Sequence, residues 1–155
     1  MLKLINHPLI THKLSLIRRK ETGTRDFRQN ISEIAGLMAY EITRDLPLRE
    51  IVIDTPLSSC TTSELSREII LVPVLRAGLG MVDGITGLIT TARVGHIGLV
   101  RDHETLAPME YYAKFPADIS EAVVMVLDPM LATGGSASAA IGAVKKRGAV
   151  TIRLV

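Results

Sequence analysis

The sequence predicts an α/β fold, a mostly parallel sheet with helices on both faces. Continuous apolar runs at residues 68–74 and 122–127 are typical of strands buried on both faces. Segments with the apolar spacing of helices alternate with these runs. Because alternating strands and helices favour parallel pairing through crossovers, we expect the helices to cover the two faces of one sheet.

Two helices are predicted in the N-terminal part. A short basic helix is expected over residues 14–20, and a long amphipathic helix over residues 25–44. The apolar positions of the long helix are Phe27, Ile31, Ile34, Ala35, Met38 and Ile42. Thr24 is the expected N-cap, Asp26 lies in the first turn, and Pro47 ends the segment.

From residue 51 the pattern changes to short strands separated by helices. Besides the two buried runs, strands are expected at residues 51–53, 94–100 and 150–155, and helices at residues 77–89 and 136–147. Gly148 follows the last helix as a stop signal. The polar, turn-rich segment 102–116, called the arm here, is expected to form a long loop or a protruding hairpin.

Size and composition limit the classes of function. The 155 residues fit a single domain, 1–155. A formal net charge of +2 and scarce aromatic residues argue against a nucleic-acid partner. The N-terminus lacks the apolar core of a signal peptide, and no apolar run approaches the roughly 20 residues of a membrane helix. With one cysteine, Cys60, the sequence predicts a cytoplasmic protein that binds neither nucleic acid nor membrane.

A loop after the second buried run has the composition of a phosphate site. It begins with an acid, contains two glycines and opens a helix. Its residues are Asp128, Pro129, Met130, Leu131, Ala132, Thr133, Gly134, Gly135 and Ser136. Glycines bring backbone N–H groups close to an anion, the helix N-terminus adds partial positive charge, and hydroxyl groups can donate to phosphate oxygens. Asp128 would be repelled by phosphate, and it suits ribose hydroxyls or a magnesium ion held by the ligand.

Taken alone this loop is a weak signal, because a tight turn without a ligand has the same composition. It is neither a P-loop nor a dinucleotide fingerprint, since both spacings are absent. Arg76 and Arg101 follow two other predicted strands. Each alone is most simply a solvated cation, but parallel strands bring their carboxyl ends to one edge, where guanidinium groups can bind pyrophosphate.

Several segments, taken in order, match one known family. They are HPLITHKLS at residues 7–15, TRDFR at 24–28, YEITRDLP at 40–47, PVLRAGLGMVDG at 73–84, GHIG at 95–98, Arg101 with Glu104, Thr105 and Leu106, and DPMLATGGS at 128–136. By these segments the sequence resembles the uracil phosphoribosyltransferases. The resemblance implies a phosphoribosyltransferase-type sheet with helices on both faces and a protruding arm.

The resemblance also implies a reaction. Uracil and 5-phosphoribosyl 1-pyrophosphate (PRPP) would give UMP and pyrophosphate in pyrimidine salvage, with Mg²⁺ as cofactor held mainly by PRPP. By position, Arg76, Arg101 and Asp128 are the catalytic residues. The two arginines contact the pyrophosphoryl group, and the residues from Asp128 to Ser136 hold the ribose and the 5′-phosphate.

Assembly is expected to be homodimeric or higher. Tyr111, Tyr112 and Phe115 would be exposed in a monomer, so the arm is expected to reach over a neighbouring subunit. A nucleotide activator, GTP, is implied by the resemblance alone.

Length is the departure from the family. Its members continue past residue 155, so the domain is expected to lack its C-terminal portion, and with it the residues that recognise uracil. Two alternatives remain open. A non-catalytic nucleotide-sensing regulator on the same fold would need a more basic surface, and a generic phosphate-binding module would need neither Arg76 nor Arg101.

Overall fold

The computed structural model describes residues 2–102 and 107–155. Its elements are α1 (Pro8–Ile17), α2 (Thr24–Ile42), β1 (Leu48–Asp54), β2 (Ser59–Leu65), β3 (Ile69–Leu75), α3 (Leu79–Thr86), β4 (Arg93–Val94), β5 (His96–Arg101), β6 (Pro108–Lys114), β7 (Val123–Leu127), α4 (Gly135–Lys146) and β8 (Thr151–Leu154). The main sheet has six strands in the order β6-β5-β3-β7-β8, with β4 paired to β3. All its pairs are parallel except β5–β6.

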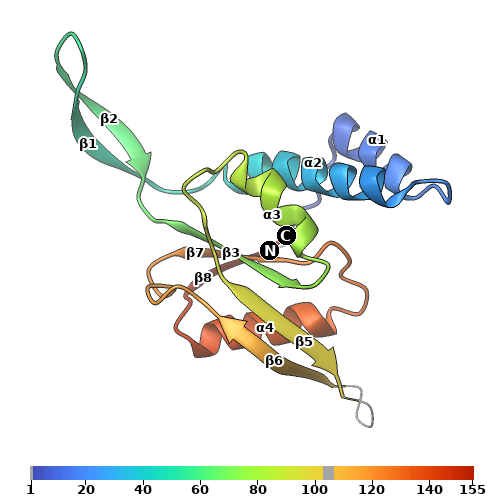
Figure 1. Ribbon diagram of the computed structural model, residues 1–155. Coiled ribbons are helices and arrows are strands. Elements are labelled where there is room, and N and C mark those ends of the chain that lie inside the picture. Colours follow the sequence, from blue (N-terminus) through green and yellow to red (C-terminus); the bar gives the residue numbers. More distant parts are fainter. Residues whose placement is uncertain (1, 103–106) are drawn as a thin grey trace.

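Helices cover both faces of this sheet, as predicted. In Figure 1, α1, α2 and α3 lie on one side of the strands and α4 lies on the other. Side chains alternate along β3, so that Leu71 packs in the core beneath α2 and α3 while Val72 packs in the core beneath α4. Both side chains are fully buried, which explains why the run reads as continuously apolar in sequence.

The helix boundaries differ from the predicted ones at both ends, and α1 ends at Ile17 instead of residue 20. α1 begins at Pro8, six residues before the predicted start, and His7 caps it by accepting a 3.2 Å hydrogen bond at Nδ1 from the Leu9 N–H. Proline fits the first helical turn because its missing N–H has no partner there in any case. In α2 the cap is Gly23, without a side-chain hydrogen bond, and Thr24 is the first helical residue.

One strand was missed. β2 pairs with β1 in an antiparallel hairpin that stands away from the rest of the molecule (Figure 1). Its residues are polar and largely exposed, so they show no hydrophobic pattern. The hairpin is held by its backbone ladder and by an ion pair of 2.6 Å between Arg49 and Glu64.

The predicted arm is partly corrected. Residues 108–114 form β6, which folds back on β5 and extends the main sheet, while Glu104, Thr105 and Leu106 lie outside the described residues. Phe115 packs against the core of its own chain, so its burial requires no second subunit. Tyr111 and Tyr112 remain 60% and 45% exposed.

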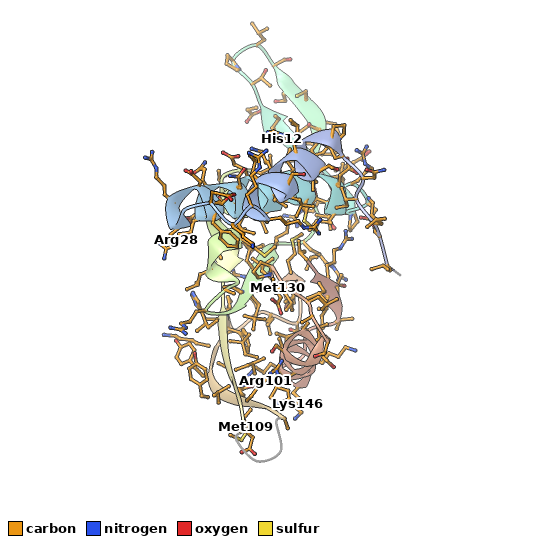
Figure 2. The ribbon with its side chains drawn as sticks, turned by 90° about the vertical axis from the view of Figure 1, so that its right-hand side faces the viewer. His12, Arg28, Arg101, Met109, Met130 and Lys146 are labelled. Atoms are coloured by element: carbon orange, nitrogen blue, oxygen red, sulfur yellow. The ribbon has the colours of Figure 1, made fainter. Side chains whose placement is uncertain are left out.

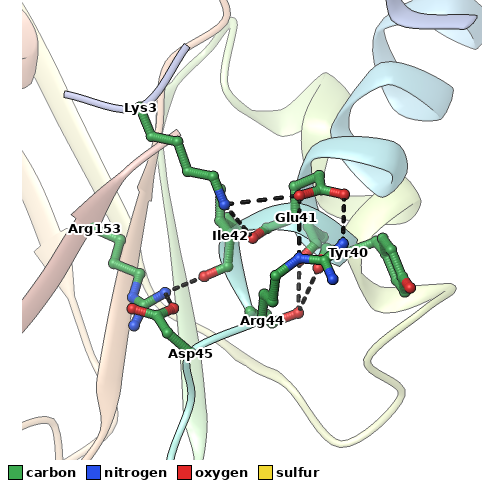
Figure 3. A network of polar contacts seen from close by, with 9 residues as sticks. Lys3, Tyr40, Glu41, Ile42, Arg44, Asp45 and Arg153 are labelled. Atoms are coloured by element: carbon green, nitrogen blue, oxygen red, sulfur yellow. Dashed lines mark hydrogen bonds and ion pairs between the residues drawn. The ribbon is translucent and has the colours of Figure 1, made fainter. Parts of the chain in front are cut away.

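Polar contacts of Arg153 join the last strand, β8, to the C-terminal end of α2 (Figure 3). Arg153 donates to the carbonyl oxygen of Ile42 and forms a 2.7 Å ion pair with Asp45. The hydrogen bond from this guanidinium lowers the pKa of the Asp45 carboxyl group. No helix among residues 2–102 and 107–155 is long and apolar enough to cross a membrane.

Candidate functional site

The structure brings the three predicted segments to one edge of the sheet. β3 pairs in parallel with both β5 and β7, so the three strands end on the same side. Arg76 directly follows β3, Arg101 ends β5, and Asp128 directly follows β7. Figure 2 faces this edge, with Met130 of the loop and Arg101 of the β5–β6 hairpin labelled on it.

The acid at the end of β7 is fixed by backbone contacts. The Asp128 N–H donates to the Val155 carbonyl oxygen at 3.0 Å, which joins the loop to the end of β8. The carboxylate oxygen Oδ1 accepts the Met130 N–H at 3.1 Å, as in an Asx turn. One carboxylate oxygen is thus engaged by the loop, and Oδ2 has no such contact within the described chain.

The loop then takes up two left-handed backbone conformations. Ala132 has φ of +46° and Gly134 has φ of +76°. The Gly134 N–H donates to the Leu131 carbonyl oxygen at 2.7 Å, which closes the turn directly before α4. Left-handed conformations are costly for residues other than glycine, so their presence shows that the surrounding contacts fix the shape of this loop.

The N-terminus of α4 is left open. Its cap residue is Gly134, which has no side chain that could accept a hydrogen bond from the first turn of the helix. The first N–H groups of a helix have no partner inside the helix, and they attract anions together with the helix dipole. Thr133 is exposed and Ser136 is half-buried at this end, and the Thr133 Oγ1 lies 3.8 Å from the position of a Cβ added to Gly135, the first residue of α4. The predicted strand–loop–helix geometry is therefore confirmed.

The turn that holds Arg76 packs directly against the end of β7, one residue before this loop begins. A Cβ added to Gly78 would lie 2.4 Å from the Leu127 carbonyl oxygen and 2.7 Å from the Val74 nitrogen. Only glycine allows such an approach between two backbones. The Leu75–Arg76 peptide bond is cis. A glycine two residues after a strand-end arginine is the sequence signal that points to this contact.

Both arginines are available to a ligand. Arg76 and Arg101 are exposed, and neither has a carboxylate partner among the residues that the structure describes. Two guanidinium groups without a carboxylate partner in the described part of the chain, together with an open helix N-terminus, give this edge a positive character that suits an anion with several charges.

A protein-built metal cage is absent from the described residues, where no three His, Cys, Asp or Glu side chains converge. Asp128 supplies a carboxylate at this edge, with one oxygen engaged by the loop. A divalent ion would therefore fit here only if a ligand supplied most of its oxygen atoms.

A cavity lies elsewhere in the molecule. It is a groove of about 570 Å³ between α1, α2 and α3, lined among others by His7, Tyr40 and Leu88. None of the predicted site residues lines it. We place the site at the sheet edge because converging polar groups and enforced backbone geometry occur there, while the groove is mainly apolar.

The fold is of the phosphoribosyltransferase type. The chain superposes on a hypoxanthine phosphoribosyltransferase from Staphylococcus aureus with a TM-score of 0.58, covering 83% of this chain and 62% of that one at 12% identity, which shows the fold alone. The AQ2163 protein from Aquifex aeolicus is more similar, with a TM-score of 0.92 and 33% identity over 99% of this chain and 74% of that one.

The sequence comparisons identify the family. Residues 4–155 match the model described as uracil phosphoribosyltransferase. Proteins of that name from Lactobacillus gasseri and Bacillus cereus are 60% and 58% identical, and the matches cover 97% and 99% of this chain and 72% and 74% of theirs. The chain belongs to the uracil phosphoribosyltransferase family.

Proposed function

We propose that this chain transfers the phosphoribosyl group of PRPP to uracil, giving UMP and pyrophosphate. The observation that carries the proposal is the packing of the Arg76 turn on the end of β7, where the loop that starts at Asp128 begins. This contact supports the proposal because Arg76 suits pyrophosphate and the loop leads to the open N-terminus of α4, which suits the 5′-phosphate. PRPP carries a phosphate group at each end of its ribose, so it matches both the arginines and the phosphate loop.

The chemistry follows from the charges. Breaking the bond at the anomeric carbon leaves positive charge on the ribose and adds negative charge to the departing pyrophosphate. Arg76 and Arg101 would stabilise the pyrophosphate as it leaves, which is the role of preorganised cations in catalysis. Asp128, with one oxygen not engaged by the loop, would accept hydrogen bonds from the ribose hydroxyls.

The remaining loop residues would hold the sugar phosphate in place. We assign the 5′-phosphate to the hydroxyl groups of Thr133 and Ser136 and to the open N–H groups of Gly135 and Ser136 in the first turn of α4. The backbone of Pro129, Met130, Leu131 and Ala132 would shape the loop around the ribose. Holding both ends of the substrate fixes the reacting carbon and lowers the entropic part of the barrier.

Magnesium is part of the proposal as a companion of the substrate. A Mg²⁺ ion bound to pyrophosphate oxygens would neutralise the leaving group, and it prefers to keep several ligands from phosphate and water. Asp128 is the protein group at this edge that could contribute to its coordination.

Three further features are proposed from family membership. These are a cytoplasmic location, activation by a nucleotide such as GTP, and a homodimer. Exposed apolar side chains on the projecting β1–β2 hairpin favour self-association; they are Leu48, Val52, Ile53, Leu57 and Leu65. Light scattering at micromolar concentration tests this, and a monomer would count against it.

The activity is tested by UMP formation from labelled uracil and PRPP, with the L. gasseri protein as positive control. Calorimetry with PRPP on the same sample measures the sugar-phosphate half of the site separately. We expect saturable PRPP binding that is tighter than binding of ribose 5-phosphate, because only PRPP has a pyrophosphoryl group for the arginines. Equal affinity for the two ligands would contradict the proposed pyrophosphate contacts.

A further inference from the structure

The C-terminal end of α4 is joined to the β5–β6 hairpin by a cluster that we call the Arg147 bridge, made of Arg147, Glu110 and Phe115. Arg147 donates to both carboxylate oxygens of Glu110, with Nη2 at 2.6 Å from Oε1 and Nη1 at 3.3 Å from Oε2. Nη1 also donates to the Ala143 carbonyl oxygen at 3.1 Å. The guanidinium lies over the Phe115 ring, 5.1 Å from its centroid.

The Arg147 bridge adds to the packing of Leu99 and Ala113 on the core beneath α4, and it matters because the attachment of the hairpin to the sheet is short. β5 pairs with β3 only at Ile97 and Gly98, since β3 ends at Leu75. From Leu99 onward the hairpin has no other strand beside it in the described chain. Glu110 is the residue opposite Leu99, so Arg147 binds the hairpin at the first residue pair beyond the sheet.

Arg101 lies in this outer part, two residues after Leu99. Between Gly98 and Leu99 the ladder contains a bulge, which changes the twist and the direction of the strand beyond it. The ring of Tyr111 lies on Gly98 so closely that an added Cβ would be 2.4 Å from the Cζ atom. The ring fixes the bulge itself, but it makes no link from the hairpin to a helix.

The same helix also begins the phosphate loop. α4 starts at Gly135, directly after the loop, and its C-cap is Arg147. One rigid element therefore has the proposed 5′-phosphate site at one end and the hairpin contact at the other. Movement of the hairpin relative to α4 would change the separation between Arg101 and the phosphate loop.

We propose that Arg147 is a positioning residue for Arg101, acting through its two-pronged ion pair with Glu110. The inference rests on the proposed function of the edge, because it requires that Arg101 contact pyrophosphate. Arg147 itself would touch no ligand. Its removal should therefore weaken ligands that need Arg101 and leave unchanged those that need only the loop.

The test compares two ligands on one variant. In Arg147→Met the apolar stem still covers Phe115, and the charge that binds Glu110 is gone. We expect the Kd for PRPP to rise about 2- to 5-fold, in keeping with a partly exposed ion pair, and the Kd for UMP to stay unchanged. Glu110→Gln should give the same pattern of affinities. It is the variant to use for this test if Arg147→Met does not fold.

A matched control exists on the other hairpin. Arg49→Met breaks an ion pair of the same 2.6 Å length on β1–β2, and it should leave both ligands unaffected. The charge exchange Arg147→Glu with Glu110→Arg should restore most of the PRPP affinity.

A double-mutant cycle completes the test. Once Arg101→Ala has removed the group to be positioned, Arg147→Met should have no further effect on PRPP. Full additivity of the two changes, equal weakening of PRPP and UMP, or no change in PRPP affinity would each overturn the inference. If the unaltered chain fails to bind PRPP, the proposed function is wrong, and that outcome is separate from any result on Arg147.

Discussion

The carboxyl edge of the main sheet and the β1–β2 hairpin are both exposed to solvent, but their backbones differ. At the edge, Ala132 and Gly134 have positive φ angles and Gly78 has no room for a side chain. The hairpin is an unbroken antiparallel ladder from Leu48 opposite Leu65 to Asp54 opposite Ser59. Exposure alone therefore does not distinguish a site from a scaffold or contact surface.

Backbone geometry does distinguish them. Left-handed residues and close backbone approaches cost free energy, and they persist only where the surrounding structure fixes them. Such positions tend to gather at binding sites, while a regular ladder tolerates side-chain changes on its exposed face. The comparison predicts that equivalent substitutions have large effects at the edge and small ones on the hairpin.

The largest effect is expected for Gly78→Val. Its side chain would meet the backbone of β7 and β3, which cannot move without disrupting the sheet. We expect a loss of more than about 3 kcal/mol in the free energy of unfolding, measured by urea denaturation. Ser63→Val on the exposed face of β2 is the control and should stay within about 0.5 kcal/mol. A Gly78→Val midpoint equal to that of the unaltered chain would show that the approach is less close than described.

The next effect concerns ligand binding. Arg76→Ala should weaken PRPP by about 1.5–3 kcal/mol through loss of charge-assisted hydrogen bonds. UMP should be weakened much less, because it has no pyrophosphate. Arg49→Ala on the hairpin should change neither affinity. Titration of each variant with PRPP and with UMP measures these affinities. Equal weakening of PRPP and UMP binding by Arg76→Ala would show that Arg76 is a structural residue.

A smaller effect is expected for Gly134→Ala, and α4 supplies its own control. At φ of +76° an alanine should cost about 1–2 kcal/mol of stability. Gly142→Ala lies inside the same helix with nothing within 4 Å of the added Cβ, and it should stabilise by up to about 1 kcal/mol. Thermal unfolding of the two variants should shift in opposite directions. Shifts of the same sign would contradict the strained geometry of the loop.

The smallest effect is a pH dependence at Asp45. Its pKa is lowered by the hydrogen bond from Arg153. A lowered folded-state pKa means that this contribution to stability is present above the unfolded value of about 3.9 and is lost as the pH falls through the folded-state pKa. Asp45→Asn should remove the loss of stability that comes from protonating Asp45. Unfolding midpoints measured from pH 7 down to pH values below the folded-state pKa of Asp45 would show this. An unchanged pH profile in the variant would contradict this assignment.

The sequence predicted the parts of the fold whose pattern comes from burial. The strands β3 and β7 are apolar on both faces, and Asp128, Arg76 and Arg101 were placed correctly because parallel strands must end on one side. β2 was missed because its polar residues have no buried face. The contact between Gly78 and Leu127 could not be predicted, since it joins two turns that are distant in sequence and depends on the sheet order.

The central claim is that the loop from Asp128 to Ser136 and the start of α4 bind the phosphate of a phosphoribosyl ligand. The most direct test is titration of the isotope-labelled protein with PRPP, followed by the backbone amide signals. The account predicts the largest, saturable shifts at the N–H groups of Gly134, Gly135 and Ser136, with small shifts on the β1–β2 hairpin. Saturable binding that leaves these three amide signals in place would contradict it.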